Sequence, residues 1–215
     1  MAIIHQNAQL SPSKPEILAA WVPSQPWSGD STDLERIGAF RFDDPDGEVG
    51  IETHLLRTGD GRILQVPLTY RGAPLHDAQD SLVATLDHTV LGTRWVYDAC
   101  ADPAYLTALV AAIATGGGAA ELVDAETGET TAGPVQVAGS GTPESPVPAI
   151  GRISHASDAA TTTVSAGGVE IELARMVGEH LGLPPGPEVL TGTWPGRRSP
   201  ALLAVVRHHD GRVRS

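Results

Sequence analysis

The amino-acid sequence predicts an α+β fold, in which curved antiparallel β-sheets are flanked by two or three helices. Three observations indicate this class. Short β-forming segments are separated by Asp-Gly turns, which supply the positive φ angles of tight hairpins. Helix-start signals occur at two places only, rather than after every strand as in a βαβ fold. No internal repeat of fixed period is found in the 215 residues.

The first expected element is a short helix that starts within residues 11–16, where serines and prolines are typical of a helix N-terminus. This start contains Lys14, the only lysine of the chain. Ile17, Leu18 and Trp21 follow on one apolar face, and Pro23 ends the helix.

A β-meander is expected next, with strands over residues 36–42, 48–57 and 62–70. The turns between them, residues 43–47 and 58–61, both end in Asp-Gly. We expect much of one buried face to come from apolar residues of these strands: Ile37, Ala39, Val49, Ile51, Ile63 and Leu68.

A fourth strand is predicted over residues 90–98, followed by a helix that runs to about Thr115. Asp102 suits the N-cap of this helix and Pro103 its first position. The glycines at 116–118 should terminate it.

The second half is expected to be mostly β. A loop is expected over residues 139–146. Two short strands come before this loop, and a final antiparallel set of strands comes after it. The predicted strands are residues 121–125, 135–138, 161–165, 169–174, 189–194 and 201–207. We divide the chain into an α+β region (1–118), a turn-rich connection (119–150), an antiparallel region (151–209) and a frayed tail (210–215).

The charge pattern excludes some classes of partner. The chain carries 26 acidic and 14 basic residues, a net charge of −12, which repels nucleic acid and anionic membranes. No apolar run is long enough to span a bilayer, and the N-terminus does not resemble a secretion signal. The single cysteine, Cys100, excludes an internal disulfide and is expected to be a small buried residue at a strand end. We therefore expect a cytoplasmic protein.

Motifs for catalysis, cofactors or metals were not found. Residues 139–141 lack the Lys-Ser/Thr of a phosphate-binding loop, and no Gly-x-Ser-x-Gly elbow occurs. The eight histidines show no metal-ligand spacing, and the adjacent His208 and His209 would point to opposite faces of a strand. We therefore predict no catalytic residue, no cofactor and no metal site.

One constellation suggests binding. Arg94 lies on one face of the predicted strand and Trp95 and Tyr97 on the other, and Trp21 and Trp27 flank nearby prolines. These five residues form a candidate surface for a glycan or a partner protein. In the alternative interpretation the aromatic residues pack in the core, while Arg94 and Asp98 form a surface ion pair.

Several ordered segments resemble the N-terminal cap region of maltokinases, and more closely the stand-alone cap-like proteins of actinobacteria. The segments are DDPDGEVGIE (43–52), VPLTYRG (66–72), LGTRWVYDA (91–99) and LTGTW (190–194). The cap resemblance covers about residues 1–115. It implies a link to the trehalose-to-glycogen route, in which maltokinases phosphorylate maltose with a bilobal fold similar to aminoglycoside phosphotransferases.

Residues 154–206 more weakly resemble the kinase N-lobe, with a departure that matters. The strand that would carry the ATP-anchoring lysine holds Glu170 and Glu172 instead, and carboxylates repel ATP phosphates. Nothing resembles the catalytic C-lobe. The resemblance therefore implies a non-catalytic cap-like protein with a partner-binding or regulatory role. The alternatives are a glycan or small-molecule binding module, and an N-lobe that joins a separate C-lobe in trans.

Overall fold

The computed structural model describes residues 2–4, 8–29, 33–178 and 188–208. Within these residues the protein is mostly β, with two α-helices, and it fits the predicted α+β class. The helices are α1 (Lys14–Trp21) and α2 (Pro103–Thr115), and the 3₁₀ turns are η1 (Val22–Ser24), η2 (Gln79–Ser81) and η3 (Ala99–Ala101). None of the described helices is long and apolar enough to cross a membrane.

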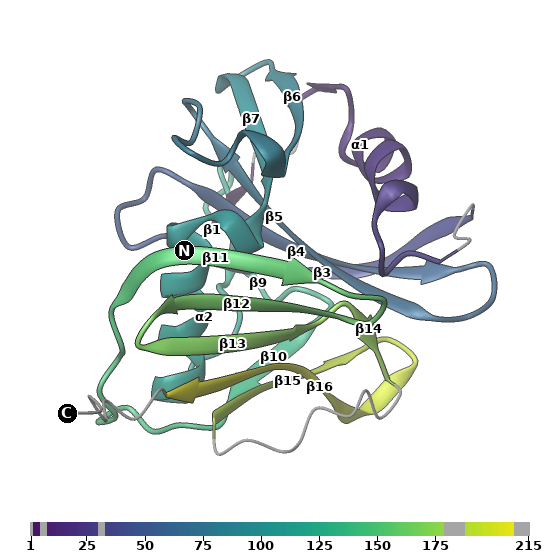
Figure 1. Ribbon diagram of the computed structural model, residues 1–215. Helices are drawn as coiled ribbons and strands as arrows, with labels where there is room; N and C mark the ends of the chain where they lie inside the picture. Colours follow the sequence, from purple (N-terminus) through teal and green to yellow (C-terminus); the bar gives the residue numbers. More distant parts are fainter. Residues whose placement is uncertain (1, 5–7, 30–32, 179–187, 209–215) are drawn as a thin grey trace.

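Two antiparallel sheets form the body of the molecule (Figure 1). The first sheet contains, in pairing order, β2 (Leu10–Ser11), β6 (Leu82–His88), β7 (Gly92–Asp98), β5 (Ile63–Arg71), β4 (Gly50–Thr58) and β3 (Leu34–Phe42), with β14 (Met176–Val177) also pairing with β5. The second sheet contains β10 (Gln136–Gly139), β15 (Glu188–Trp194), β16 (Arg197–His208), β13 (Val169–Ala174), β12 (Thr161–Gly167) and β11 (Ile150–Ser157).

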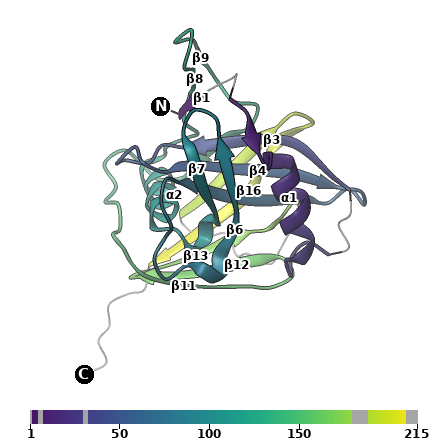
Figure 2. The same ribbon diagram turned by 90° about the horizontal axis from the view of Figure 1, so that it is seen from above.

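A small third sheet lies at one end of the molecule, where β8 (Leu122–Asp124) pairs with β1 (Ala2–Ile4) and β9 (Thr130–Thr131) (Figure 2). The pairing of β1 with β8 is parallel. This sheet takes no part in the site described below.

The helix α1 begins where the sequence predicts and for the predicted reason. The Ser13 hydroxyl accepts a hydrogen bond from the Glu16 backbone N–H, and the Glu16 carboxylate accepts one from the Ser13 N–H at 2.8 Å. This reciprocal capping box satisfies two N–H groups that a helix start leaves free. It places Lys14 on the first turn, close to the sheet.

The helix α2 is capped at both ends as expected. The Asp102 carboxylate accepts from the Ala104 N–H at 2.9 Å, and Gly116 adopts φ +69° at the C-terminus. The loop at 139–146 then passes directly under the end of α2. A Cβ on Gly141 would lie 1.7 Å from the Ala114 carbonyl oxygen, so glycine is required there by the close approach of two backbones.

Two hydrophobic clusters lie on opposite faces of the first sheet. One fills the space between the first sheet, α2 and the second sheet, and includes Phe40, Leu55, Leu109, Ile171 and Leu203. The other lies under α1 and includes Ile17, Leu18, Trp27, Leu64 and Val96. Because both faces are covered, nearly every residue of β4 and β5 is buried.

Most of the predicted elements are present within two residues of their expected bounds, including the β3–β4–β5 meander, α1, α2 and the strands β12, β13 and β15. The strand β16 is also present, but it starts at Arg197, four residues before the predicted start. Two longer strands were missed, β6 and β11, together with four strands of two or three residues, β1, β2, β9 and β14. The predicted strand over 90–98 is also too long, because Val90 and Leu91 lie in the turn of the β6–β7 hairpin and the strand starts at Gly92. The predicted frayed tail, 210–215, lies outside the described residues.

Candidate binding site

A pocket of about 570 Å³ opens on the face of the first sheet that also carries α1. Its floor comes from β3, β4 and β5, and its walls come from the start of α1, from the turn between β3 and β4, and from the β6–β7 hairpin. In Figure 1 the α1 helix and the β6–β7 hairpin stand above the β3–β4–β5 part of the sheet. We call this cavity the Glu52 pocket, after the carboxylate in its floor.

Three cations surround the buried carboxylate of Glu52. Lys14 Nζ forms a short ion pair with Glu52 Oε2, Arg36 Nη2 lies 3.2 Å from Oε1, and Arg41 Nη2 lies 3.5 Å from Oε2. Burial alone would raise the pKa of Glu52, but His54, Lys14 and Arg41 together lower it well below its usual range. Glu52 is therefore ionised, and the cluster keeps more positive than negative charge.

His54 lies beside this cluster and is fully buried. Its Nε2 is 3.3 Å from the Tyr70 hydroxyl and 3.9 Å from Glu52, and its Nδ1 has no hydrogen-bond partner among the described residues. Burial lowers the pKa of His54 to about 4, and Lys14, Arg36 and Arg41 act in the same direction against Glu52. The imidazole is thus neutral near pH 7 and adds no charge to the surrounding cations.

Arg94 forms part of the wall opposite α1. It makes no ion pair with any described residue, and its Nε is buried without a hydrogen-bond partner. Gly72 leaves room for this side chain, because a Cβ at that position would lie 2.7 Å from Arg94 Nη1. The pocket therefore contains a guanidinium that forms no ion pair with the described part of the chain.

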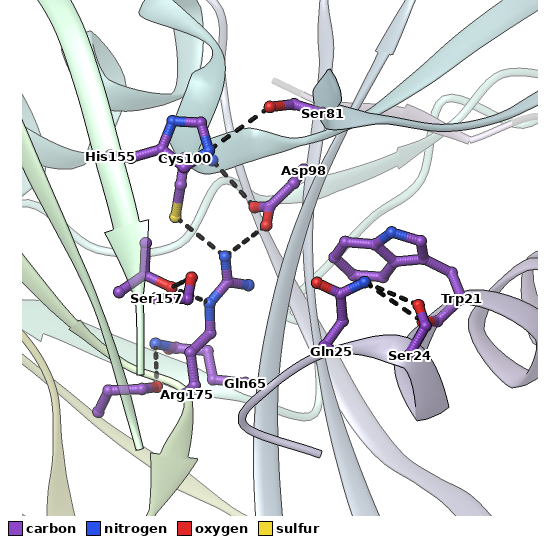
Figure 3. Close-up of polar contacts among 12 residues, drawn as sticks. Trp21, Ser24, Gln25, Gln65, Ser81, Asp98, Cys100, His155, Ser157 and Arg175 are labelled. Atoms are coloured by element: carbon purple, nitrogen blue, oxygen red, sulfur yellow. Dashed lines mark hydrogen bonds and ion pairs between the residues drawn. The ribbon is translucent and has the colours of Figure 1, made fainter. Parts of the chain in front are cut away.

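A second buried ionic cluster joins the two sheets (Figure 3). Arg175 donates to Asp98 Oδ2 at 2.6 Å, to the Thr162 hydroxyl at 2.6 Å and to Cys100 Sγ at 3.3 Å. Its guanidinium also lies 4.8 Å from the centre of the Trp27 ring. We call this group the Arg175 cluster. It is buried, and its geometry is that of a structural ion pair that links the two sheets.

The five candidate residues do not form one surface. Trp27 is fully buried against Arg175, and Tyr97 is 2% exposed, with its hydroxyl accepting from the Leu75 N–H at 2.9 Å. Trp21 is half-buried and packs edge-on against Trp27 at 5.8 Å. Trp95 is half-buried and lies on the opposite face of β7 from Arg94. Of the five, only Arg94 lines the Glu52 pocket.

The alternative pairing of Arg94 with Asp98 is wrong. Asp98 is buried and its carboxylate binds Arg175, which is 77 residues away in the sequence. Cys100 is buried at the end of β7, as predicted, and burial raises the pKa of its thiol. A buried neutral thiol is inert, so this residue is a packing element.

Sequence reasoning missed the floor of the pocket, namely Arg41, Glu52 and Tyr70, and the place of Lys14 in its wall. A signal was present in β4, where Glu52 and His54 lie between Ile51 and the apolar pair Leu55 and Leu56. Buried polar residues of this kind need partners, and their spacing of two places both on the same face. Their partners come from α1 and β3 and have no local pattern.

The strand β13 carries the two glutamates noted in the sequence. Glu172 Oε1 lies 2.9 Å from Arg207 Nη1 on the neighbouring β16, and Glu170 Oε1 lies 3.9 Å from the same atom. Both are partly exposed ion pairs within the sheet. Across the part of the chain that the structure describes, no group of His, Cys, Asp and Glu residues is arranged to hold a metal ion.

Comparison with known families gives one match. Residues 21–102 match the family described as the maltokinase N-terminal cap domain. The matched segment runs from the end of α1 to the N-cap of α2, and so contains all of β3 to β7. The resemblance of this region to a maltokinase cap is confirmed. No curated protein matches the chain.

Proposed function

We propose that this protein is a non-catalytic, cap-like module that binds a partner protein, an enzyme of trehalose, maltose or glycogen metabolism. The observation that carries the proposal is the match of residues 21–102 to the maltokinase N-terminal cap domain. A cap is one part of a larger kinase, and the matched segment here contains five strands of the first sheet, β3 to β7.

The arrangement of β13 supports a role without ATP chemistry. In the weak likeness to a kinase N-lobe, this strand would present a lysine to the nucleotide. It presents Glu170 and Glu172, and both are paired with Arg207 within the sheet. The only lysine of the chain, Lys14, is paired with Glu52 on the far side of the first sheet. ATP should therefore leave the melting temperature unchanged; a saturable rise would favour the trans-assembled N-lobe instead.

The tip of the β6–β7 hairpin is the surface best suited to a partner. Val90 is 59% exposed and Leu91 is 46% exposed. The tip is held in shape because the His88 ring Nδ1 accepts from the N–H groups of both residues at 3.2 Å, and Thr89 N–H donates to the Gln9 carbonyl at 3.1 Å. Arg94 lies on the same hairpin, so we expect the partner to present apolar side chains next to a carboxylate.

This proposal is tested with purified components by biolayer interferometry against trehalose synthase, glycogen branching enzyme and maltokinase from the same cell. We expect one of these to bind, and Val90→Asp to weaken that binding at least tenfold, because it places a charge in an apolar contact. Val147→Asp is the matched control, since Val147 is 43% exposed in a loop of the second sheet. If none of the enzymes binds, or if both variants bind like the native protein, the proposal is wrong.

A further inference from the structure

The Glu52 pocket has a property that a partner-binding surface does not require: cations gather around the carboxylate in its floor. Lys14 and Arg41, which line the pocket, share the carboxylate of Glu52 with Arg36, which approaches it from outside the pocket lining. The nearest titratable neighbour, His54, is neutral near pH 7 and neither adds to this charge nor removes it. Because Glu52 and His54 are buried, the local dielectric is lower than in bulk water, and this strengthens the attraction of the nearby cations for an anion.

Arg94 extends this charge across the cavity. Its Nε is buried and has no hydrogen-bond partner among the residues that the structure describes, although a buried donor of this kind normally finds one. An anion in the pocket would supply the missing acceptor. A guanidinium suits a phosphate or carboxylate because its N–H groups form parallel hydrogen bonds to two oxygens.

The other acidic residues of the pocket lining, Asp43, Asp44 and Glu48, lie in the turn between β3 and β4. The carboxylate of Asp44 accepts from the N–H groups of Asp46, Glu48 and Val49 at 3.3, 3.0 and 2.8 Å, so it stabilises its own turn. Asp43 and Glu48 also line the cavity, and Asp43 has contacts of its own. These carboxylates can accept hydrogen bonds from hydroxyl groups on the outer part of a ligand.

We propose that the Glu52 pocket binds a small phosphorylated metabolite, with its phosphate between Lys14, Arg41 and Arg94 and its hydroxyl groups toward the acidic turn. A volume of about 570 Å³ is more than a free phosphate ion needs and is typical of sites for molecules of one or two rings. A polyanion is disfavoured because the whole chain carries a net charge of −12, which repels long anions while the local cations hold a short one.

The test is titration calorimetry of the full chain with glucose 6-phosphate, inorganic phosphate and maltose, at constant ionic strength set with chloride. Glucose 6-phosphate should bind most tightly, inorganic phosphate more weakly, and maltose not measurably. Arg94→Gln should weaken binding of both phosphate ligands by roughly tenfold, the effect of losing one charge-assisted hydrogen bond. Arg57→Gln is the matched control, because Arg57 pairs with Glu35 on an exposed surface outside the pocket.

Two results would overturn the inference. The first is that neither phosphate ligand binds, or that both bind Arg94→Gln as tightly as the native chain. Equal binding to the variant would mean that the ligands are held by general charge attraction and not by Arg94. In the second, maltose binds as tightly as glucose 6-phosphate, which would favour the glycan-binding alternative. Circular dichroism of each variant shows whether it is folded, and Lys14→Gln gives an independent removal of charge from the opposite wall. The partner-binding proposal is tested with Val90→Asp instead, at a residue outside the pocket lining, so either proposal can fail alone.

Discussion

The Glu52 pocket and the Arg175 cluster contain the same kinds of side chain in contrasting surroundings. Their carboxylates lie in one row of the first sheet, because Leu68 on β5 is paired with Glu52 on one side and with Asp98 on the other. Two strand spacings, about 10 Å, therefore separate the two strands that carry the acids. At Asp98 a single guanidinium is enclosed by Thr162, Cys100 and the Trp27 ring. At Glu52 three cations meet beside an open cavity.

This difference separates a structural ion pair from a site that can accept a ligand. A buried charge with one partner depends on that partner completely, because removing it leaves an ion without compensation. A carboxylate with several partners tolerates the loss of one, and its excess cations remain able to bind an added anion. The following four variants test this distinction, from the largest expected effect to the smallest.

Arg175→Met should destabilise the protein by about 3 to 5 kcal/mol, because it leaves Asp98 buried without its partner. Urea denaturation followed by fluorescence measures the free energy of unfolding. The double variant Arg175→Met/Asp98→Asn should be more stable than the single one, since the uncompensated charge is gone. A loss below about 1 kcal/mol for the single variant would show that the cluster is not a structural ion pair.

Acidification should weaken the fold through His54. Its pKa is lowered by folding to about 4, whereas the unfolded chain has the ordinary value near 6.5. Between these values the unfolded chain binds a proton that the folded chain refuses, so stability is fully present above pH 6.5 and is lost as the pH falls to 4. The difference amounts to about 3 kcal/mol. His54→Gln should show a flatter dependence in this window, and an unchanged slope would contradict the assignment.

Lys14→Met should cost only about 1 kcal/mol, because Arg36 and Arg41 remain beside Glu52 and the lysine side chain is 25% exposed. The same urea denaturation compares it with Arg175→Met. Should the two variants prove equally unstable, the distinction between the shared and the single ion pair would be lost.

Glu172→Gln should change the free energy of unfolding by no more than about 0.5 kcal/mol, because its pair with Arg207 is partly exposed. It serves as the baseline for the other three. A loss of several kcal/mol here would mean that β13 depends on its glutamates in a way that the packing does not explain.

Local patterns predicted the elements well where a residue type and its position are tied to the backbone. Asp-Gly turns, the Ser13 and Asp102 caps and the Gly116 terminus were all readable in the sequence and are found in the structure. The missed strand β11 is an edge strand whose residues are mostly exposed, so it has no apolar alternation to detect. Propensity alone does not distinguish such a segment from a loop.

The candidate site was harder to predict, because its contacts join distant parts of the chain. Lys14 and Glu52 are 38 residues apart, and Arg175 and Asp98 are 77 apart. The sequence offered a nearer partner for Asp98, namely Arg94 on the same face of the same strand. That inference failed because Asp98 lies at the end of β7 that packs against the second sheet, whereas Arg94 lies toward the hairpin tip. Strand position, rather than charge pattern, decided which pair formed.

The contacts between the first and the second sheet have a practical consequence for dividing the molecule into fragments. Gln65 on β5 donates one hydrogen bond to the Ala174 carbonyl and another to the Leu203 carbonyl, both at 3.0 Å. Phe40 and Leu55 on the first sheet share a core with Ile171 and Leu203 on the second. A fragment cut after α2 would expose this apolar surface and leave the Gln65 amide without acceptors. The cap-like half is therefore not a portable unit, and grafting it onto another protein requires its second sheet as well.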